Sequence, residues 1–338
     1  MFAQAEASFD QGDYPQAKTL FAKVLERAPE SANTLYNIGL IWEREGHLQE
    51  AQVAYRSALE VDPHHRPSLL NLGRVYRQEE KFEKAISLYE GALRDSALAR
   101  DLALLNNLAI GYRLVKQYPK AETTLRVVLA EDSSNLDAHR TLMLVFADQG
   151  FYGLAELVGA NGMKIDDRDP GLHNNQGLVY LKMGDKQLAL QEFRKAVGVD
   201  DRFAEAYTNL GAMALEYRDY ANAEKYLAQA LALAPRSYLN HLYYAFALEG
   251  QKHGSASKEA SAAAEFEKAL AIHRDPEAVC GAGWAYSSQK ETRSKAIDYL
   301  TQCKALGVTA ARERQKIDAK LMVLQAVGKE LPRDENQK

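Results

Sequence analysis

Five asparagines stand at one register of a recurring pattern in this chain. They are Asn37, Asn71, Asn107, Asn175 and Asn209, and Thr141 interrupts the series. A side-chain amide offers both a donor and an acceptor, so it matches a peptide group without selecting the side chain that the peptide carries. A row of such amides could hold the backbone of an extended peptide. The alternative is that asparagine is simply common at this register, where it holds a neighbouring turn or hydrates a groove.

Four arginines occupy registers next to the asparagines: Arg74, Arg77, Arg113 and Arg140. The acidic residues at comparable positions are Glu43, Asp137 and Asp148. The balance predicts a mildly basic surface in this part of the chain, which recognition of an acidic peptide would require. The alternative is an ordinary solvated, charged helix face.

Motifs for catalysis or metal binding are missing from the sequence. It has no Walker A loop, G-x-S-x-G, H-E-x-x-H or paired C-x-x-C. Gly281-Ala-Gly283 lacks the third glycine of a dinucleotide fingerprint, and His64-His65 is expected in a solvated turn without further metal ligands. We therefore predict a protein that is not an enzyme and that needs no cofactor or metal.

The element that must position these side chains is a repeat with a constant step. Its skeleton recurs after 34 residues in the pairs Gly39 and Gly73, Ala51 and Ala85, Tyr55 and Tyr89, Ala58 and Ala92, and Gly177 and Gly211. Within one repeat, Leu35, Ile38, Gly39 and Trp42 share a helix face, whereas Asn37 and Arg44 point away from it. Small residues on the packing face let helix axes approach closely.

The pattern resembles the tetratricopeptide repeat (TPR) from Phe2 to about Gly307. The resemblance implies an all-α, right-handed superhelix of about nine helix-turn-helix repeats in which the first helix of each repeat lines a concave surface. The asparagine series then looks like the asparagine ladder of some TPR superhelices, where amides bind an extended peptide. The sequence departs from the two-carboxylate clamp of chaperone-binding TPR domains, because lysine is missing from the corresponding registers.

The predicted organisation is a TPR array over residues 1–307, a capping helix over 308–328 and a flexible tail over 329–338. The approximate repeats are 1–31, 32–65, 66–101, 102–135, 136–169, 170–203, 204–237, 238–275 and 276–307. The fifth repeat is expected to be the weakest, because Gly153, Gly159 and Gly162 lower its helix propensity. In the eighth, residues 251–261 are expected to lengthen the turn between the helices.

Composition excludes some partners and leaves the compartment open. With 42 Lys+Arg against 46 Asp+Glu, the net charge of -4 disfavours nucleic acid, and no apolar run is long enough to span a bilayer.

Cys280 and Cys303 could form a disulfide, but two small buried thiols are the simpler expectation. The short first helix suggests a longer precursor with a removed export or lipoprotein signal, although a naturally short helix explains it equally. A periplasmic or cell-envelope location and a cytoplasmic one both stay open.

Three functions follow as hypotheses. The first is a scaffold that binds extended peptide segments or partner proteins in its concave groove. The second is a bacterial cell-envelope TPR protein for the assembly of pilus, secretion or gliding machinery. The third is the substrate-binding array of a larger enzyme such as a glycosyltransferase.

Overall fold

A computed structural model describes residues 1–251, 256–288, 290–307 and 311–326. Within these ranges the regular structure is α-helical, and no strand is present. The chain divides into two compact units, Met1–Asp185 and Lys186–Lys338. The predicted all-α array of TPR helix pairs is confirmed.

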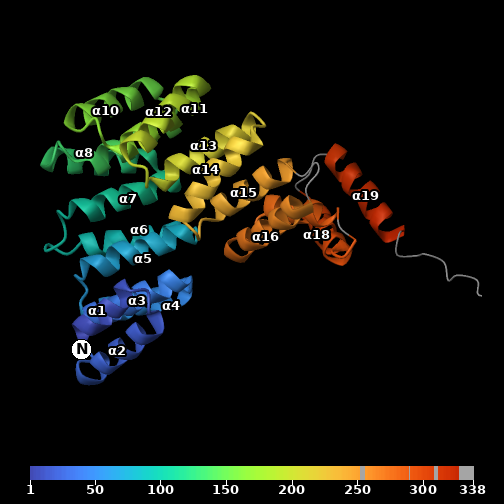
Figure 1. Ribbon diagram of the computed structural model, residues 1–338. Helices are drawn as coiled ribbons and strands as arrows, with labels where there is room; N and C mark the ends of the chain where they lie inside the picture. The colour runs from blue at the N-terminus through green and yellow to red at the C-terminus, as the bar shows by residue number, and fades with distance from the viewer. Residues whose placement is uncertain (252–255, 289, 308–310, 327–338) are drawn as a thin grey trace, which may run out of the picture. The chain divides into compact units, whose positions relative to one another are not determined.

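The first unit contains helices α1 to α11 (Figure 1). Their bounds are α1 Phe2–Asp10, α2 Tyr14–Arg27, α3 Ala32–Glu45, α4 Leu48–Val61, α5 Arg66–Gln78, α6 Phe82–Leu93, α7 Leu102–Leu114, α8 Tyr118–Glu131, α9 Leu136–Asp148, α10 Tyr152–Ile165 and α11 Pro170–Met183. Consecutive helices form the pairs that the repeat pattern predicts, and the first helix of each pair has an odd number.

The second unit contains helices α12 to α19. Their bounds are α12 Lys186–Val199, α13 Ala204–Glu216, α14 Tyr220–Leu233, α15 Tyr238–Gly250, α16 Ala256–Ile272, α17 Pro276–Tyr286, α18 Arg293–Ala305 and α19 Ala311–Ala326. Residues 256–261 of the insertion in the eighth repeat belong to the start of α16, and residues 252–255 lie outside the described residues. The predicted tail over 329–338 lies outside the described residues.

One backbone geometry recurs at the turn inside the repeats. Gly46 and Gly184 follow the first helix with φ values of 87° and 86°, in the left-handed region. At the same register Glu80 and Arg218 adopt φ values of 58° and 57°, although a β-carbon disfavours this conformation. The turn geometry is thus kept by the packing of the repeat even where the sequence offers no glycine.

Helix pairs pack through a small residue on the first helix and a large one on the second. Gly39 faces the Tyr55 ring, and Gly73 faces the Tyr89 ring; both tyrosines are fully buried. A β-carbon on either glycine would occupy space that the ring fills, so each glycine allows the close approach of two helices.

In the fifth repeat the large residue stands on the first helix and the small one on the second. Met143, which is fully buried, stands on α9 where other repeats have a small residue, and Gly159 faces it from α10. A β-carbon on Gly159 would lie 2.7 Å from the Met143 methyl carbon, and one on Gly162 would lie 2.9 Å from a Leu172 methyl carbon. The interpretation of these two glycines as weak points was therefore incomplete, because they make room for larger partners.

Gly153 differs from the other two glycines of α10. It is exposed, and a β-carbon there would meet no other atom within 4 Å. We expect Gly153→Ala to stabilise the first unit by about 0.5–1 kcal/mol through helix propensity, and Gly162→Ala to destabilise it. Urea unfolding followed by circular dichroism measures both; equal signs for the two variants would contradict the packing role of Gly162.

The end of the second unit is held by α19 and by a disulfide. Ile317, Leu321 and Leu324 on α19 are buried in the core that also contains residues of α17 and α18. Cys280 on α17 and Cys303 on α18 form a disulfide with 5.0 Å between their α-carbons. The simpler expectation of two separate thiols is wrong, because the helices of this pair bring the two side chains together.

Candidate functional site

The first helices of consecutive repeats form a continuous surface in each unit. In the first unit α5 contacts α7, α7 contacts α9, and α9 contacts α11; in the second unit α13 contacts α15, and α15 contacts α17. We call these surfaces the first-helix faces. Each first-helix face carries the side chains at the asparagine register and at the adjacent registers.

The amide groups on the first-helix face of the first unit already bind parts of the protein. Asn71 Nδ2 donates to the Tyr36 hydroxyl at 3.0 Å, and Asn107 Nδ2 donates to the Ala103 carbonyl within its own helix at 2.9 Å. Asn175 is buried, and its Nδ2 donates to the Arg140 carbonyl at 3.0 Å. Asn71 and Asn175 thus link neighbouring first helices, a structural role different from the turn contact or groove hydration that the sequence suggested as alternatives.

The two ends of the series differ from the middle. Asn37 on α3 is half-buried, and its side chain makes no hydrogen bond to the part of the chain that the structure describes. Asn209 stands on α13 in the second unit and has other interactions. The side-chain amide of Asn37 and the side-chain oxygen of Asn107, Oδ1, are therefore available for hydrogen bonds to a peptide.

Three of the four arginines on this face are paired with carboxylates. Arg74 Nη2 lies 2.5 Å from Glu43 Oε1, and Arg140 pairs with Asp137 and with Asp169, whose Oδ2 is 3.1 Å from Arg140 Nη1. These pairs neutralise much of the positive charge that the sequence places here. An acidic partner would have to compete with them.

Asp148 on α9 lies between two cations of the neighbouring first helices. Its carboxylate is 3.8 Å from Arg113 Nε and 3.1 Å from Lys182 Nζ. Burial lowers the pKa of Arg113, since desolvation penalises the charged guanidinium. Arg77 Nη1 donates to the Tyr89 hydroxyl at 3.2 Å, so this arginine belongs partly to the helix-pair core.

His64 and His65 have different surroundings although they are adjacent. His64 is exposed, with its Nε2 2.7 Å from Asp95 Oδ2. His65 is buried and is the N-cap of α5: its Nδ1 accepts from the Ser68 backbone N–H, and its Nε2 is 3.0 Å from Asn33 Oδ1. The expectation of a solvated turn is therefore wrong for His65. With Nδ1 accepting, Nε2 carries the proton and donates to Asn33.

The N-cap predicts a pH-dependent stability. Burial lowers the pKa of His65 below its ordinary value of 6.5, so the unfolded chain binds this proton at a higher pH than the folded chain. Neutral His65 makes its full contribution to the free energy of unfolding above about pH 6.5, and this contribution is lost as the pH falls below that value. Protonation converts Nδ1 into a donor and breaks the cap, at a cost of about 1 kcal/mol.

The variant His65→Asn keeps a capping side chain that does not titrate. We expect its free energy of unfolding to fall less than that of the wild type between about pH 7.5 and about pH 5. His64→Gln serves as the control, because His64 does not cap the helix. If wild type and His65→Asn show the same pH dependence, His65 is not the titrating cap.

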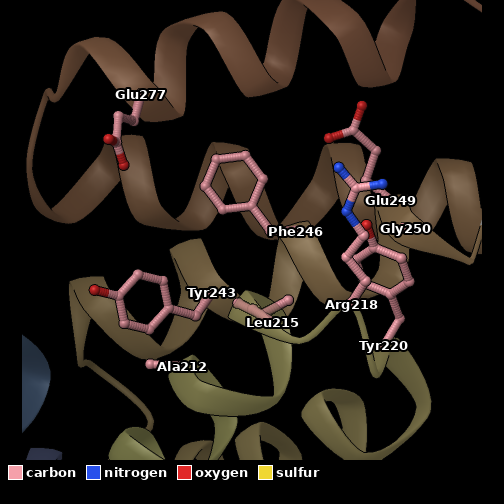
Figure 2. Close-up of a pocket in the computed structure, with 9 residues that line it drawn as sticks. All are labelled: Ala212, Leu215, Arg218, Tyr220, Tyr243, Phe246, Glu249, Gly250 and Glu277. Carbon is pink, nitrogen blue, oxygen red and sulfur yellow. The ribbon is translucent and has the colours of Figure 1, made fainter. Parts of the chain in front are cut away.

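The second unit contains a pocket of about 740 Å³ that the sequence interpretation missed. Figure 2 shows its lining residues, which come from α13, α14, α15, α17 and the turn after α13. They are Ala212, Leu215, Arg218, Tyr220, Tyr243, Phe246, Glu249, Gly250 and Glu277. The signal was present: Tyr243 stands 34 residues after Asn209, and Phe246 stands 34 residues after Ala212. On α15 this register therefore carries an aromatic residue instead of an asparagine.

The first unit has a smaller pocket of about 590 Å³ away from the asparagine series. It lies among α4, α5 and α6 and is lined by Leu59, Leu72, Tyr76 and Leu88 together with charged residues at its rim. Leu72 and Tyr76 are buried core residues, so the pocket is a gap beside the helix-pair core.

Within the described ranges, no group of three or more His, Cys, Asp or Glu side chains is arranged to hold a metal ion. Among the helices that the structure describes, none combines the length and the apolar character that crossing a membrane requires.

Comparisons with known proteins follow the repeat pattern. Residues 2–124 match the family described as the cilia and flagella-associated protein 70 middle TPR-like domain. Residues 174–238 match a family described as tetratricopeptide repeat. Tetratricopeptide repeat protein 6 of Homo sapiens is 26% identical over 134 residues, which cover 38% of this chain and 25% of that protein. The chain therefore spans only a quarter of the length of this relative.

Two solved structures share the fold. The Pseudomonas aeruginosa pilF structure has a TM-score of 0.55 and 21% identity, covering 67% of this chain and 100% of that chain. The structure of PilW, described as a widely conserved type IV pilus biogenesis factor, has a TM-score of 0.50 and 17% identity, covering 60% and 93% of the two chains.

Proposed function

Because the chain is a tetratricopeptide repeat protein, we propose that it is a non-catalytic scaffold that binds extended segments of partner proteins on its first-helix faces. The observation that carries the proposal is the contact between consecutive first helices, which places amides at one register along a continuous surface. TPR proteins mediate protein–protein interactions, and the proteins matched above are repeat proteins. An alternative proposal is that the chain is the substrate-binding array of a larger enzyme. The matches reported above include no enzyme family.

The accessible amides define the test. Peptides selected from a random phage-displayed library on the full chain are synthesised and titrated by calorimetry against the wild type and the double variant Asn37→Ala/Asn107→Ala. Each lost hydrogen bond costs about 0.5–1.5 kcal/mol, so we expect the variant to bind about tenfold more weakly. Neither amide holds a neighbouring repeat, so helicity should not change.

Asn161→Ala is the matched control, because Asn161 is exposed on α10, a second helix. Its affinity for the selected peptides should stay within about twofold of the wild type. Failure to select any peptide, or equal binding by the double variant and the wild type, would contradict peptide binding on this face.

A cell-envelope assembly role is a second candidate, supported by the disulfide. Cys280 and Cys303 are paired, and disulfides persist mainly in oxidising compartments such as the bacterial periplasm. The fold likeness to pilF and PilW fits a role of this kind in pilus assembly. Thiol labelling of the protein in cells of its source tests the location: free thiols there would contradict an oxidising compartment.

A further inference from the structure

The first helices of the second unit are acidic, whereas those of the first unit are nearly balanced in charge. In the first unit, α5, α7, α9 and α11 contain six basic residues and two acidic ones (Arg66, Arg74, Arg77, Arg113, Arg140 and Lys182 against Asp137 and Asp148), but α1 and α3 add one basic residue, Arg44, and four acidic ones, Glu6, Asp10, Glu43 and Glu45. In the second unit, α13, α15 and α17 contain Glu205, Glu216, Glu249 and Glu277 and no lysine or arginine. The first-helix face of the second unit therefore attracts positive charge.

The pocket in this face combines aromatic rings with a carboxylate. Tyr243 and Phe246 are three residues apart on α15, so they share a helix face, and both are half-buried. Figure 2 shows them beside each other, with the Glu277 carboxylate on the facing helix α17. Burial raises the pKa of Tyr243, and the Glu277 carboxylate raises it further, which reflects how close the two groups are.

Glu277 is the acidic group of this pocket with the most exposed charge. It is exposed, and it makes no ion pair with any residue in the described part of the chain. Arg218 lines the opposite end of the pocket, near Glu249 (Figure 2). The end formed by Tyr243, Phe246 and Glu277 is thus apolar on one side and negatively charged on the other.

We infer that this pocket receives a lysine or arginine side chain from a basic segment of a partner protein. The side-chain methylenes pack against Leu215 and Phe246, and the cation lies against the aromatic rings within reach of Glu277. The inference rests on the proposed scaffold function and assigns a partner chemistry to the second unit. It is the reverse of the acidic partner that the arginines of the first unit suggested.

Two fluorescein-labelled peptides of equal length test this charge preference by fluorescence anisotropy on the full chain. One alternates glycine with lysine, and the other alternates glycine with glutamate. We expect the lysine peptide to bind at least about tenfold more tightly, with an affinity that falls as salt is added. Equal binding of the two peptides would overturn the inference.

The site is tested with a matched pair of variants. Glu277→Gln is expected to weaken lysine-peptide binding about fivefold to tenfold, and Phe246→Leu, which keeps an apolar side chain, about threefold. Glu205→Gln removes the same charge from an exposed position on α13 outside the pocket and should change binding by less than about twofold. Equal effects of Glu277→Gln and Glu205→Gln would mean general charge attraction instead of a pocket.

The two proposals fail in different ways. If the scaffold function is wrong, no library peptide binds the full chain. If only the pocket is wrong, library peptides still bind and depend on Asn37 and Asn107, but the affinity of the lysine peptide is unchanged in Glu277→Gln.

Discussion

Replacing Gly159 by leucine is expected to destabilise the first unit by about 2–3 kcal/mol, because the new side chain has no space between α9 and α10. A β-carbon alone would lie 2.7 Å from the Met143 methyl carbon and 2.8 Å from Gln176 Oε1. Both neighbours are buried, so neither can turn into solvent. Urea unfolding followed by circular dichroism gives the free energy, and hydrogen exchange of α9 and α10 locates the change.

A second substitution should restore part of the loss. Met143→Ala alone leaves a cavity and is expected to cost about 2–4 kcal/mol. Combined with Gly159→Leu, it returns the fifth repeat to the small-then-large arrangement of Gly73 and Tyr89. The double variant should therefore be more stable than the sum of the single effects by at least about 1 kcal/mol.

Gly153→Leu is the control, since that glycine faces open space on the same helix. It should be neutral or slightly stabilising. Strict additivity of Met143→Ala and Gly159→Leu would show that the two positions do not share one space.

Loss of the disulfide is expected to have the largest effect in the second unit. Cys280 and Cys303 are 23 residues apart in sequence, and a cross-link of this span stabilises a fold by about 2–4 kcal/mol. Adding reductant, or introducing Cys280→Ala together with Cys303→Ala, should lower the thermal midpoint of this unit. α17 carries Glu277, so the lysine peptide should also bind more weakly once the helix is less firmly held.

The cysteine content provides the control. The chain has only two cysteines, so reductant can act on no other disulfide and should leave the double variant unchanged. Thiol titration of the denatured, unreduced protein should detect no free thiol. Two free thiols, or a midpoint that does not respond to reductant in the wild type, would contradict the pairing.

The sequence by itself determined the repeat and the fold class. The step from Gly39 to Gly73 and from Tyr55 to Tyr89 places a small residue on one helix opposite a large one on the next, and this contact is local in the chain. Local periodicity also assigned Ile317, Leu321 and Leu324 to the buried side of the last helix. Such features follow from the helical period alone, because the partners lie within one repeat of each other.

The roles of the polar residues were decided by tertiary structure. Asn71 and Tyr36 are one repeat apart, and so are Arg113 and Asp148, so whether these side chains face a ligand or each other depends on how neighbouring first helices stack. The same holds for the cap formed by His65 with Asn33. A register defines the direction of a side chain, but the distance to its partner is set by helix packing between repeats.

Sequence periodicity also failed to predict two contacts within a helix pair. One is the exchange of sizes between Met143 and Gly159, and the other is the disulfide between Cys280 and Cys303. From the sequence alone, three glycines in α10 indicate a weak helix, and two cysteines far apart in the chain indicate separate thiols. Only the packed helices show that Gly159 faces a large side chain and that the two sulfurs meet. Helix propensity acts on each residue alone, whereas close packing and cross-linking depend on pairs of residues that the fold brings together.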